Sequence, residues 1–297
     1  MENTQRINEQ NSRVDQMIIY HNKSFKDITT FKIGGPIENL YYPSNTEDLK
    51  SLVKQLKEEK YYLVGAGSKI LAANRSFKNV VCMKMFEKKM SFNGCFVDVG
   101  AGAYAPQVSY KCTDFGLSGL EFLVDIPATM GGAVVMNAGF MGNEMSQICE
   151  SVSMVDSEGE SIELDDIKWS RRWSSIQNID GIVTNVRLKL LPSTTIEIKK
   201  RIKSYQNIRL DNQPMGFANA GGIFINHIVL RDVVKYLPYM RQGDAEIVAN
   251  CPNFIINHGS AKFDEVLHLI NLIEEHAKTL GISMKREIKI MGGIYED

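Results

Sequence analysis

A glycine-rich stretch from Phe122 to Glu144, FLVDIPATMGGAVVMNAGFMGNE, constrains the fold more than any other part of the chain. It contains Gly131, Gly132, Gly139 and Gly142 and almost no charge. Glycine allows positive φ angles and lets another group approach the backbone closely. The stretch is therefore interpreted either as a buried turn between core elements or as a cradle around a ligand.

A second glycine-rich turn, Val64 to Lys69 (VGAGSK), lies upstream and directly follows the apolar run Tyr61 to Val64. Successive backbone N–H groups in such turns form concave sites for anions. Two loops of this kind could present their N–H groups to one large polar ligand, which favours the cradle.

The composition excludes several classes of partner. The 297 residues include 34 Lys and Arg against 35 Asp and Glu, a net charge of -1, so neither nucleic acid nor an anionic membrane surface is predicted as a partner. No uninterrupted apolar run reaches the ~18 residues that a membrane span needs. The polar N-terminus lacks the apolar core of a secretory signal, so a cytoplasmic location is predicted.

The cysteines and histidines predict neither disulfides nor a metal site. The five cysteines are widely spaced without a Cys-x-x-Cys pair, and the five histidines lack His-x-x-x-His spacing. Metal is therefore not expected.

The pattern along the chain predicts three domains, residues 1–76, 77–192 and 193–297. In the first, residues 1 to about 25 are interpreted as a polar lead-in and 29–36 as a strand-like piece ending in a turn. A helix is expected to begin at 44–48, where capping side chains and acids precede an apolar face. A strand through Val64 would complete a βαβ-like unit.

The second domain is predicted to contain short strands around 80–82, 96–99, 152–155, 161–164 and 182–190, with a hairpin turn at 157–160 and a helix over 106–115. In the third, a basic helix begins near Ile196. The clearest helix runs from Phe263 to Leu280 and ends at Gly281, as is typical of a C-terminal glycine.

Six motifs, in this order, resemble those of the UDP-N-acetylenolpyruvoylglucosamine reductase family. They are Thr30–Gly35 (TFKIGG), Gly65–Ser68 (GAGS), Ile126–Ala133 (IPATMGGA) with Met136–Gly139 (MNAG), Ala220–Gly221, Asn253–Asn257 (NFIIN) and Glu287–Ile288. A single Gly-x-Gly is weak evidence, but an ordered set through most of the chain is specific.

The resemblance implies an α+β fold, with a two-part FAD-binding module of the MurB/PCMH type and a C-terminal α+β substrate-binding domain. It implies non-covalent FAD, reduction by NADPH, and hydride transfer to the double bond of UDP-N-acetylglucosamine enolpyruvate in peptidoglycan precursor synthesis. The expected partners are small molecules, a UDP-sugar or an enolpyruvyl compound.

The resemblance also assigns site residues. Arg172 and Glu287 would be catalytic, and Asn226 and Ser174 would bind substrate. The residues expected to bind the cofactor are Gly65, Ala66, Gly67, Ser68, Lys69, Ile126, Pro127, Ala128, Thr129, Gly131, Gly132, Ala133, Asn137 and Gly139.

The chain departs from the family pattern on the substrate side. The family loop Ala-Gly-Ser-x-Phe-Lys-Asn-Pro reads AGGIFINH here, so Gly222 replaces the proton-donating serine, Ile225 the lysine and His227 the proline. Arg171 replaces the tyrosine of Tyr-Arg-x-Ser, and Lys69 replaces the asparagine of Gly-x-Gly-Ser-Asn. The flavin loops are kept while the substrate side is altered.

Three interpretations remain open: a flavin oxidoreductase with changed chemistry, the family reductase with reduced activity, or a catalytically silent FAD- or nucleotide-sugar-binding relative. Arg171 and Arg172 could be a solvated surface pair, and Glu287 could form an exposed ion pair. His227 could be a new acid or a structural residue. The sequence leaves the true substrate, the choice of NADPH or NADH and the oligomeric state open.

Overall fold

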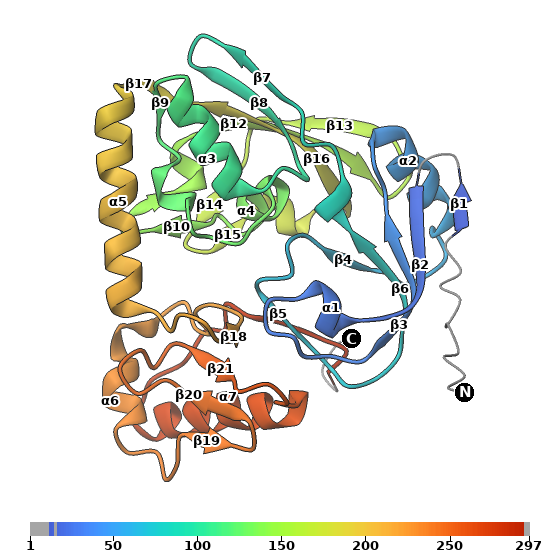
Figure 1. Cartoon of the computed structure of the whole chain (residues 1–297). Helices are drawn as coiled ribbons and strands as arrows, with labels where there is room; N and C mark the ends of the chain where they lie inside the picture. Colours follow the sequence, from blue (N-terminus) through green and yellow to red (C-terminus); the bar gives the residue numbers. More distant parts are fainter. Residues whose placement is uncertain (1–11, 15–16, 294–297) are drawn as a thin grey trace, which may run out of the picture.

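The computed structural model describes residues 12–14 and 17–293, and the chain folds into two five-stranded sheets and a C-terminal domain (Figure 1). The first sheet has the order β1-β2-β3-β6-β4. Its strands are β1 (Ser12–Val14), β2 (Met17–Ser24), β3 (Pro36–Tyr42), β4 (Tyr62–Val64) and β6 (Phe77–Cys82). β3 and β4 both pair with β6 in parallel, the arrangement of a βαβ unit around α2 (Thr46–Gln55).

The start of α2 confirms the predicted helix start at 44–48. The Asn45 side chain caps the helix by accepting a hydrogen bond from the Asp48 N–H, and Glu47 and Asp48 lie in the first turn. Leu49, Leu52 and Val53 are buried, as the apolar face predicted.

Two expectations in the first domain were wrong. The part of the lead-in at 17–24 forms strand β2, whereas residues 1–11 and 15–16 lie outside the described residues. Residues 29–35 form no strand, because Ser24 caps the short helix α1 (Phe25–Ile28) and the chain then turns at Thr29–Lys32, where the Lys32 N–H donates to the Thr29 carbonyl at 3.4 Å.

The second sheet has the order β13-β12-β16-β8-β7. Its strands are β7 (Met90–Asn93), β8 (Phe96–Gly100), β12 (Cys149–Asp156), β13 (Ser161–Leu164) and β16 (Gly181–Lys189), and all neighbours are antiparallel. The strands predicted at 96–99, 152–155, 161–164 and 182–190 and the hairpin at 157–160 are thereby confirmed, as is the helix α3 (Ala105–Asp114). The strand predicted at 80–82 exists but belongs to β6 of the first sheet.

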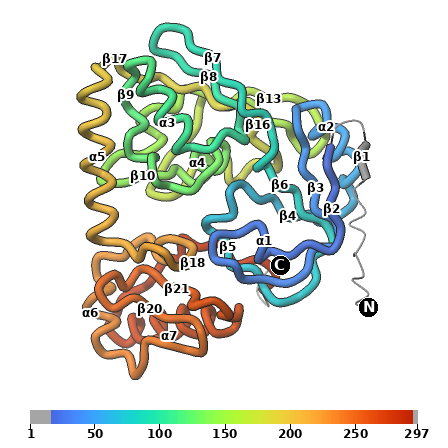
Figure 2. Tube along the Cα trace, viewed as in Figure 1, coloured from blue at the N-terminus to red at the C-terminus, as the bar shows by residue number. Residues whose placement is uncertain are grey.

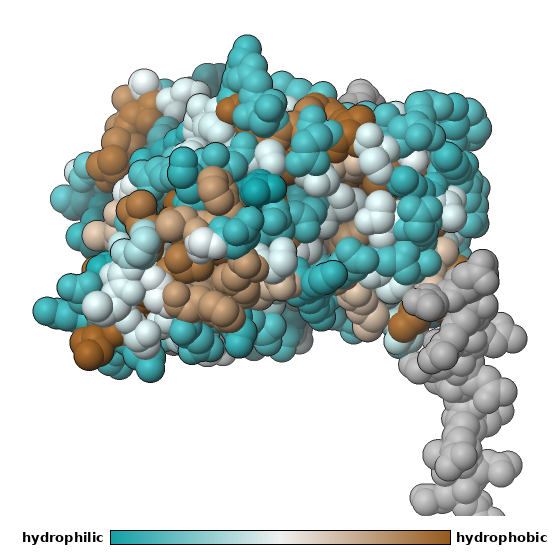
Figure 3. Space-filling view, turned by 90° about the horizontal axis from the view of Figure 1, so that it is seen from above, coloured by the Kyte–Doolittle hydropathy of each residue, from teal (hydrophilic) through white to brown (hydrophobic). Residues whose placement is uncertain are grey.

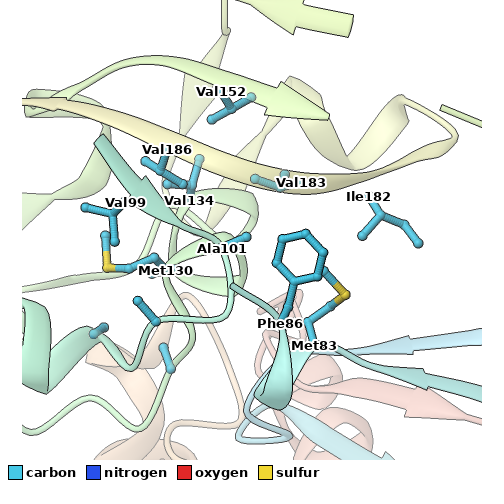
Figure 4. Close-up of a cluster of buried hydrophobic side chains, with 14 of the residues drawn as sticks. Met83, Phe86, Val99, Ala101, Met130, Val134, Val152, Ile182, Val183 and Val186 are labelled. Carbon is cyan, nitrogen blue, oxygen red and sulfur yellow. The ribbon is translucent and has the colours of Figure 1, made fainter. Parts of the chain in front are cut away.

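Helix α4 (Met130–Val135) lies within the glycine-rich stretch and packs on this sheet. Met130 and Val134 contact the same buried cluster as Val99, Val183 and Val186 (Figure 4). Gly131 permits this packing, since a Cβ there would lie 3.0 Å from the Cβ of Ala101. The stretch therefore contains a short buried helix as well as turns.

Helix α5 (Thr195–Asn212) leads from the second sheet to the C-terminal domain, as Figure 1 shows on the left. That domain contains the sheet β18-β21-β20-β19, covered by α7 (Phe263–Thr279). The bounds are β18 (Ala218–Asn219), β19 (Arg241–Gln242), β20 (Ala245–Ile247), β21 (Ile255–Asn257) and α6 (Leu230–Val234). α5 and α7 confirm the two predicted helices, and Gly281 has the expected positive φ of 73°.

The chain finally returns to the first domain. β22 (Lys289–Met291) pairs in parallel with β5 (Ile70–Ala72), and Figure 2 shows the red C-terminal segment beside β5. The remaining short strands are β9 (Leu117–Ser118) with β17 (Leu191–Pro192), β10 (Gly139–Phe140) with β11 (Asn143–Glu144), and β14 (Trp169–Ser170) with β15 (Trp173–Ser174).

The first sheet is buried on both faces. Side chains alternate along a strand, so Val81 of β6 joins the core of the second sheet whereas Val80 and Cys82 join a core that continues into the C-terminal domain. The division into domains 1–76, 77–192 and 193–297 stays a prediction. Its first boundary would separate β6, which begins at Phe77, from the rest of the first sheet. A first boundary after Cys82 would leave that sheet whole.

The face in Figure 3 is mostly hydrophilic and carries separate apolar patches. Among residues 12–14 and 17–293, no helix is long and apolar enough to cross a membrane.

Candidate active site

The loop Gly65 to Ser68, hereafter the glycine loop, follows β4 and packs tightly against two other segments. A Cβ on Gly67, at φ 72°, would overlap the carbonyl oxygen of Ile28, and a Cβ on Gly65 would lie 2.7 Å from Thr129 Oγ1. The glycines are thus required by close approach within the protein. Across the described residues, the N–H groups of Ala66, Gly67 and Ser68 donate to no protein acceptor.

The second glycine turn differs, because the protein already uses its N–H groups. The N–H groups of Met130 and Gly131 donate to the carbonyls of Ala103 and Ala101, and that of Gly132 donates to Thr129 Oγ1. We expected both turns to offer N–H donors to a ligand, and at these three positions the donors are occupied. Gly132 nevertheless borders open space, since Thr129 Oγ1, at 3.1 Å, is the one neighbour that a Cβ there would meet.

Both turns line one cavity of about 1090 Å³, which also reaches the C-terminal domain. This volume is slightly above the roughly 300–1,000 Å³ of small-molecule sites, which suits a large ligand. Unused backbone N–H groups beside cationic side chains suit a ligand with phosphates. The arrangement fits FAD, and a β-substituent on Gly132 would occupy part of this space.

Three segments far apart in sequence meet at one end of the cavity. The parallel pair β5–β22 sets Lys69, which precedes β5, beside Glu287, which precedes β22. The Lys289 N–H donates to the Lys69 carbonyl at 2.8 Å, and the Glu287 N–H donates to the Ile223 carbonyl at 2.7 Å. The loop containing Gly222 is thereby fixed to the same place.

Lys69, Arg172 and Glu287 form a charged corner there. Glu287 Oε1 lies 2.9 Å from Lys69 Nζ and 3.1 Å from Arg172 Nε. The Glu287 side chain is 10% exposed and that of Arg172 20%. Glu287 is therefore not an exposed ion pair, and Arg172 is not a solvated surface residue.

Arg172 lies in the tight turn of the β14–β15 hairpin at φ 59°, the left-handed region that costs a bulky residue about 1–2 kcal/mol. Its Nη2 donates to the Gly139 carbonyl at 2.7 Å and its Nη1 to the Asn137 carbonyl at 3.5 Å. These bonds fix the guanidinium and leave one N–H on each terminal nitrogen without a hydrogen bond to protein, although Nη1 also lies 4.0 Å from Glu144 Oε1.

Lys69 is held by two acceptors. Its Nζ donates to the Gly222 carbonyl at 2.7 Å and contacts Glu287. Burial lowers the pKa of Lys69, Glu287 opposes that shift, and Arg172 adds to it. The ammonium is consequently a stronger acid than an ordinary lysine.

Gly222 lies directly against Asn253. A Cβ on Gly222 would stand 2.6 Å from Asn253 Nδ2. The Asn253 amide is fixed in turn, because its Oδ1 accepts from the Phe224 N–H at 2.8 Å and its Nδ2 donates to the Phe224 carbonyl at 3.0 Å. Asn253 therefore occupies the space next to Gly222, and a larger residue at position 222 would require this side chain to move.

Most predicted site residues line the cavity, but Ala133, Asn137, Ser174 and Asn226 do not. Ser174 Oγ donates to the Val135 carbonyl, and Asn137 links Glu144, Ser170 and Ser146 around the Arg172 hairpin. Asn226 bonds the backbone of Ser283 and Lys285. These side chains hold the loops of the site, and their direct contact with ligand stays a prediction.

His227 lines the cavity but is exposed. Its Nδ1 lies 3.4 Å from Arg171 Nη2 and 3.2 Å from the Ile225 carbonyl. Its hydrogen bonds do not reach Gly222 or the charged corner.

Arg209 of α5 was missed by the sequence interpretation. It lines the cavity at 7% exposure, lies 3.9 Å over the Phe140 ring, and its Nε has no partner among the described residues. Burial lowers its pKa to about 10. An arginine within a basic helix carries no local signal that separates it from its exposed neighbours.

These features define a protein with one large ligand-binding cavity, lined by both parts of a two-sheet module and by a C-terminal domain. A family model described as FAD binding domain matches residues 37–165, and one described as the C-terminal domain of UDP-N-acetylenolpyruvoylglucosamine reductase matches residues 213–291. The chain belongs to the UDP-N-acetylenolpyruvoylglucosamine reductase family. The resemblance, the α+β fold and FAD as cofactor are thereby confirmed.

The chain is similar to relatives over nearly its whole length. The UDP-N-acetylenolpyruvoylglucosamine reductase of Caldanaerobacter subterraneus subsp. tengcongensis is 31% identical over 286 residues, 92% of this chain and 94% of the relative. The enzyme of the same name from Prochlorococcus marinus is 33% identical over 282 residues, which are 91% of this chain and 97% of the relative. The crystal structure of the Thermus caldophilus enzyme superposes with a TM-score of 0.80 at 31% identity, covering 93% of this chain and 99% of that one.

Proposed function

We propose that this protein reduces UDP-N-acetylglucosamine enolpyruvate with FAD and NADPH, and that Gly222 alters the protonation step and lowers the rate. One observation supports the reaction most strongly. Arg172 and Glu287 are 3.1 Å apart at the cavity end where the glycine loop meets the C-terminal domain.

The backbone would hold the cofactor. The free N–H groups of Ala66, Gly67 and Ser68 would bind the pyrophosphate. When bound, FAD supplies the hydride after reduction by NADPH. No His or Cys lies in either glycine turn, so the cofactor would be non-covalent.

The charged corner would handle the substrate. The two remaining N–H groups of Arg172 would bind a carboxylate or an enolate oxygen, which is where negative charge develops. Glu287 would hold both cations, Lys69 and Arg172, in place.

A catalytically silent binder is the alternative, and Gly222 favours it because glycine has no proton to give. The strained backbone of Arg172 argues for catalysis, since strain of this kind persists where the surroundings require one geometry.

The test uses purified protein under anaerobic conditions. We expect a yellow protein whose flavin NADPH bleaches and UDP-N-acetylglucosamine enolpyruvate reoxidises. UDP-N-acetylglucosamine, which lacks the double bond, is the control and should not reoxidise it. A colourless protein that FAD cannot reconstitute would contradict cofactor binding. Reduced flavin that the substrate leaves unchanged would exclude the family reaction, and flavin that NADPH does not bleach would indicate the silent binder.

A further inference from the structure

We propose that Lys69 is the proton donor of this protein and performs the role for which Gly222 has no side chain. The inference rests on the proposed function. Lys69 lines the cavity, and its Nζ lies 2.7 Å from the Gly222 carbonyl. A Cβ on the adjacent Gly221 would be only 3.0 Å from the same nitrogen.

The contacts of Lys69 leave a proton available. An ammonium group has three N–H donors. Two of them meet the Gly222 carbonyl and Glu287 Oε1, so one N–H remains to be directed into the cavity. The side chain keeps 26% of its surface accessible, which a substrate in the cavity could contact.

The electrostatic surroundings suit an acid that gives up its proton. Burial lowers the pKa of Lys69, and Glu287 opposes this shift by stabilising the ammonium form. Arg172, which also lies near Glu144, favours release of the proton. Arg171, His227 and Lys289 lie further along the same lining. A general acid works best when its pKa approaches the working pH.

The step balances without another reactant. Hydride addition forms one C–H bond, and the π electrons of the double bond move to the neighbouring carbon. That electron pair takes a proton from Lys69 Nζ, the N–H bonding pair stays on nitrogen, and the lysine becomes a neutral amine. Solvent reprotonates the amine once the product leaves.

Two alternatives assign Lys69 other roles. It could bind FAD through its charge, as the sequence interpretation expected, or it could serve as a structural partner of Glu287. Arginine distinguishes these from proton donation, since it keeps the charge but does not lose a proton in proteins.

The experiment compares Lys69→Arg and Lys69→Ala with the parent. We expect both variants to keep FAD, measured by absorbance per protein, and to be reduced by NADPH at the parent rate. Reoxidation by the substrate should fall by about 10²- to 10⁴-fold, the usual contribution of a general acid. Added methylammonium should partly restore the Lys69→Ala variant.

The pH profile gives a second readout. As pH rises through the lowered pKa of Lys69, the ammonium is lost, so parent reoxidation should decline. Neither variant should show that decline.

Lys84 provides the matched control. It also has a pKa lowered by burial, and its Nζ donates to the Ile28 carbonyl at 2.7 Å, but it does not line the cavity. The Lys84→Met variant should keep the parent rate of reoxidation and the parent pH profile.

Each other outcome overturns the proposal. If the reduced flavin of Lys69→Arg is reoxidised at the parent rate, the role of Lys69 is electrostatic. If both variants lose FAD, Lys69 is a cofactor ligand. A slow reaction without amine rescue and with the parent pH profile makes it structural. If the parent itself is not reoxidised, the proposed function fails, and the role of Lys69 fails with it.

Discussion

Two parts of the cavity are built in opposite ways. The glycine loop and Thr129–Gly132 together are called the backbone wall. This wall presents main-chain groups to the cavity and requires glycine where a Cβ would meet protein or enter the cavity. The charged corner, Lys69, Arg172 and Glu287, presents long side chains on segments more than a hundred residues apart.

The difference shows how each part tolerates change. In the backbone wall a Cβ on Gly65 or Gly67 would meet protein, and a branched side chain on Gly132 would extend into the cavity, so few substitutions are compatible with it. In the charged corner the groups can be exchanged, provided that each buried charge keeps a partner. A family member can therefore keep its cofactor wall while altering the residues that act on the substrate.

The largest expected effect is at the backbone wall. Gly132→Val should abolish FAD binding, because the branched side chain would extend into the cavity. Flavin absorbance after reconstitution with FAD measures the loss.

Gly132→Ala is the matched control. Its methyl group would stand 3.1 Å from Thr129 Oγ1, a contact that a small shift relieves, and alanine favours the helix by up to about 1 kcal/mol. It should keep most of the flavin. Full FAD occupancy in Gly132→Val would show that the cofactor does not contact the wall at Gly132.

The charged corner should respond differently. Arg172→Ala and Glu287→Gln should each keep FAD bound but slow substrate-dependent reoxidation by about 10²- to 10³-fold, the range for removing one electrostatic stabiliser of a transition state. Stopped-flow absorbance of the reduced flavin measures this rate.

Arg187→Ala provides the control, because Arg187 pairs with Asp98 at the surface and does not line the cavity. It should react as the parent does. Parent rates in both charged-corner variants would place the reacting groups elsewhere in the cavity.

The sequence predicted the backbone wall better than the charged corner. Glycine turns, helix caps and strand alternation are local patterns, so α2, α7 and the turn after β4 could be predicted. Arg172 and Glu287 were expected only through the resemblance, since neither Arg171–Arg172 nor the charged run around Glu287 has a distinctive pattern.

Long-range pairing could not be predicted. The contact of Lys69 with Glu287 follows from β5 pairing with β22, across more than two hundred residues. The fit of Asn253 against Gly222 likewise depends on tertiary packing. Lys69 was therefore expected among the cofactor ligands rather than beside the Gly222 carbonyl.

The smallest expected effect is that of Gly222→Ser, which tests whether the site beside the charged corner can accommodate the family's serine. A Cβ at residue 222 would meet Asn253 Nδ2 at 2.6 Å, and that amide is bonded to the Phe224 backbone on both sides. Gly222→Ser should lower the free energy of unfolding by about 1–3 kcal/mol, the usual cost of overpacking. The rate of reoxidation should change by less than about tenfold, since catalytic groups that act as a unit are not restored one at a time.

Gly222→Ala separates packing from chemistry, because it adds the same Cβ without a hydroxyl. If Asn253 alone determines the outcome, thermal melts and reoxidation rates of the serine and alanine variants should agree. A serine variant that reacts far faster than the alanine variant would mean that the hydroxyl delivers the proton. The donor position would then still be open in this chain, and Lys69 would be dispensable once serine is present. Equal rates would mean that the corner has been rebuilt around Lys69 and Asn253, so that the glycine is part of a changed arrangement rather than a simple loss.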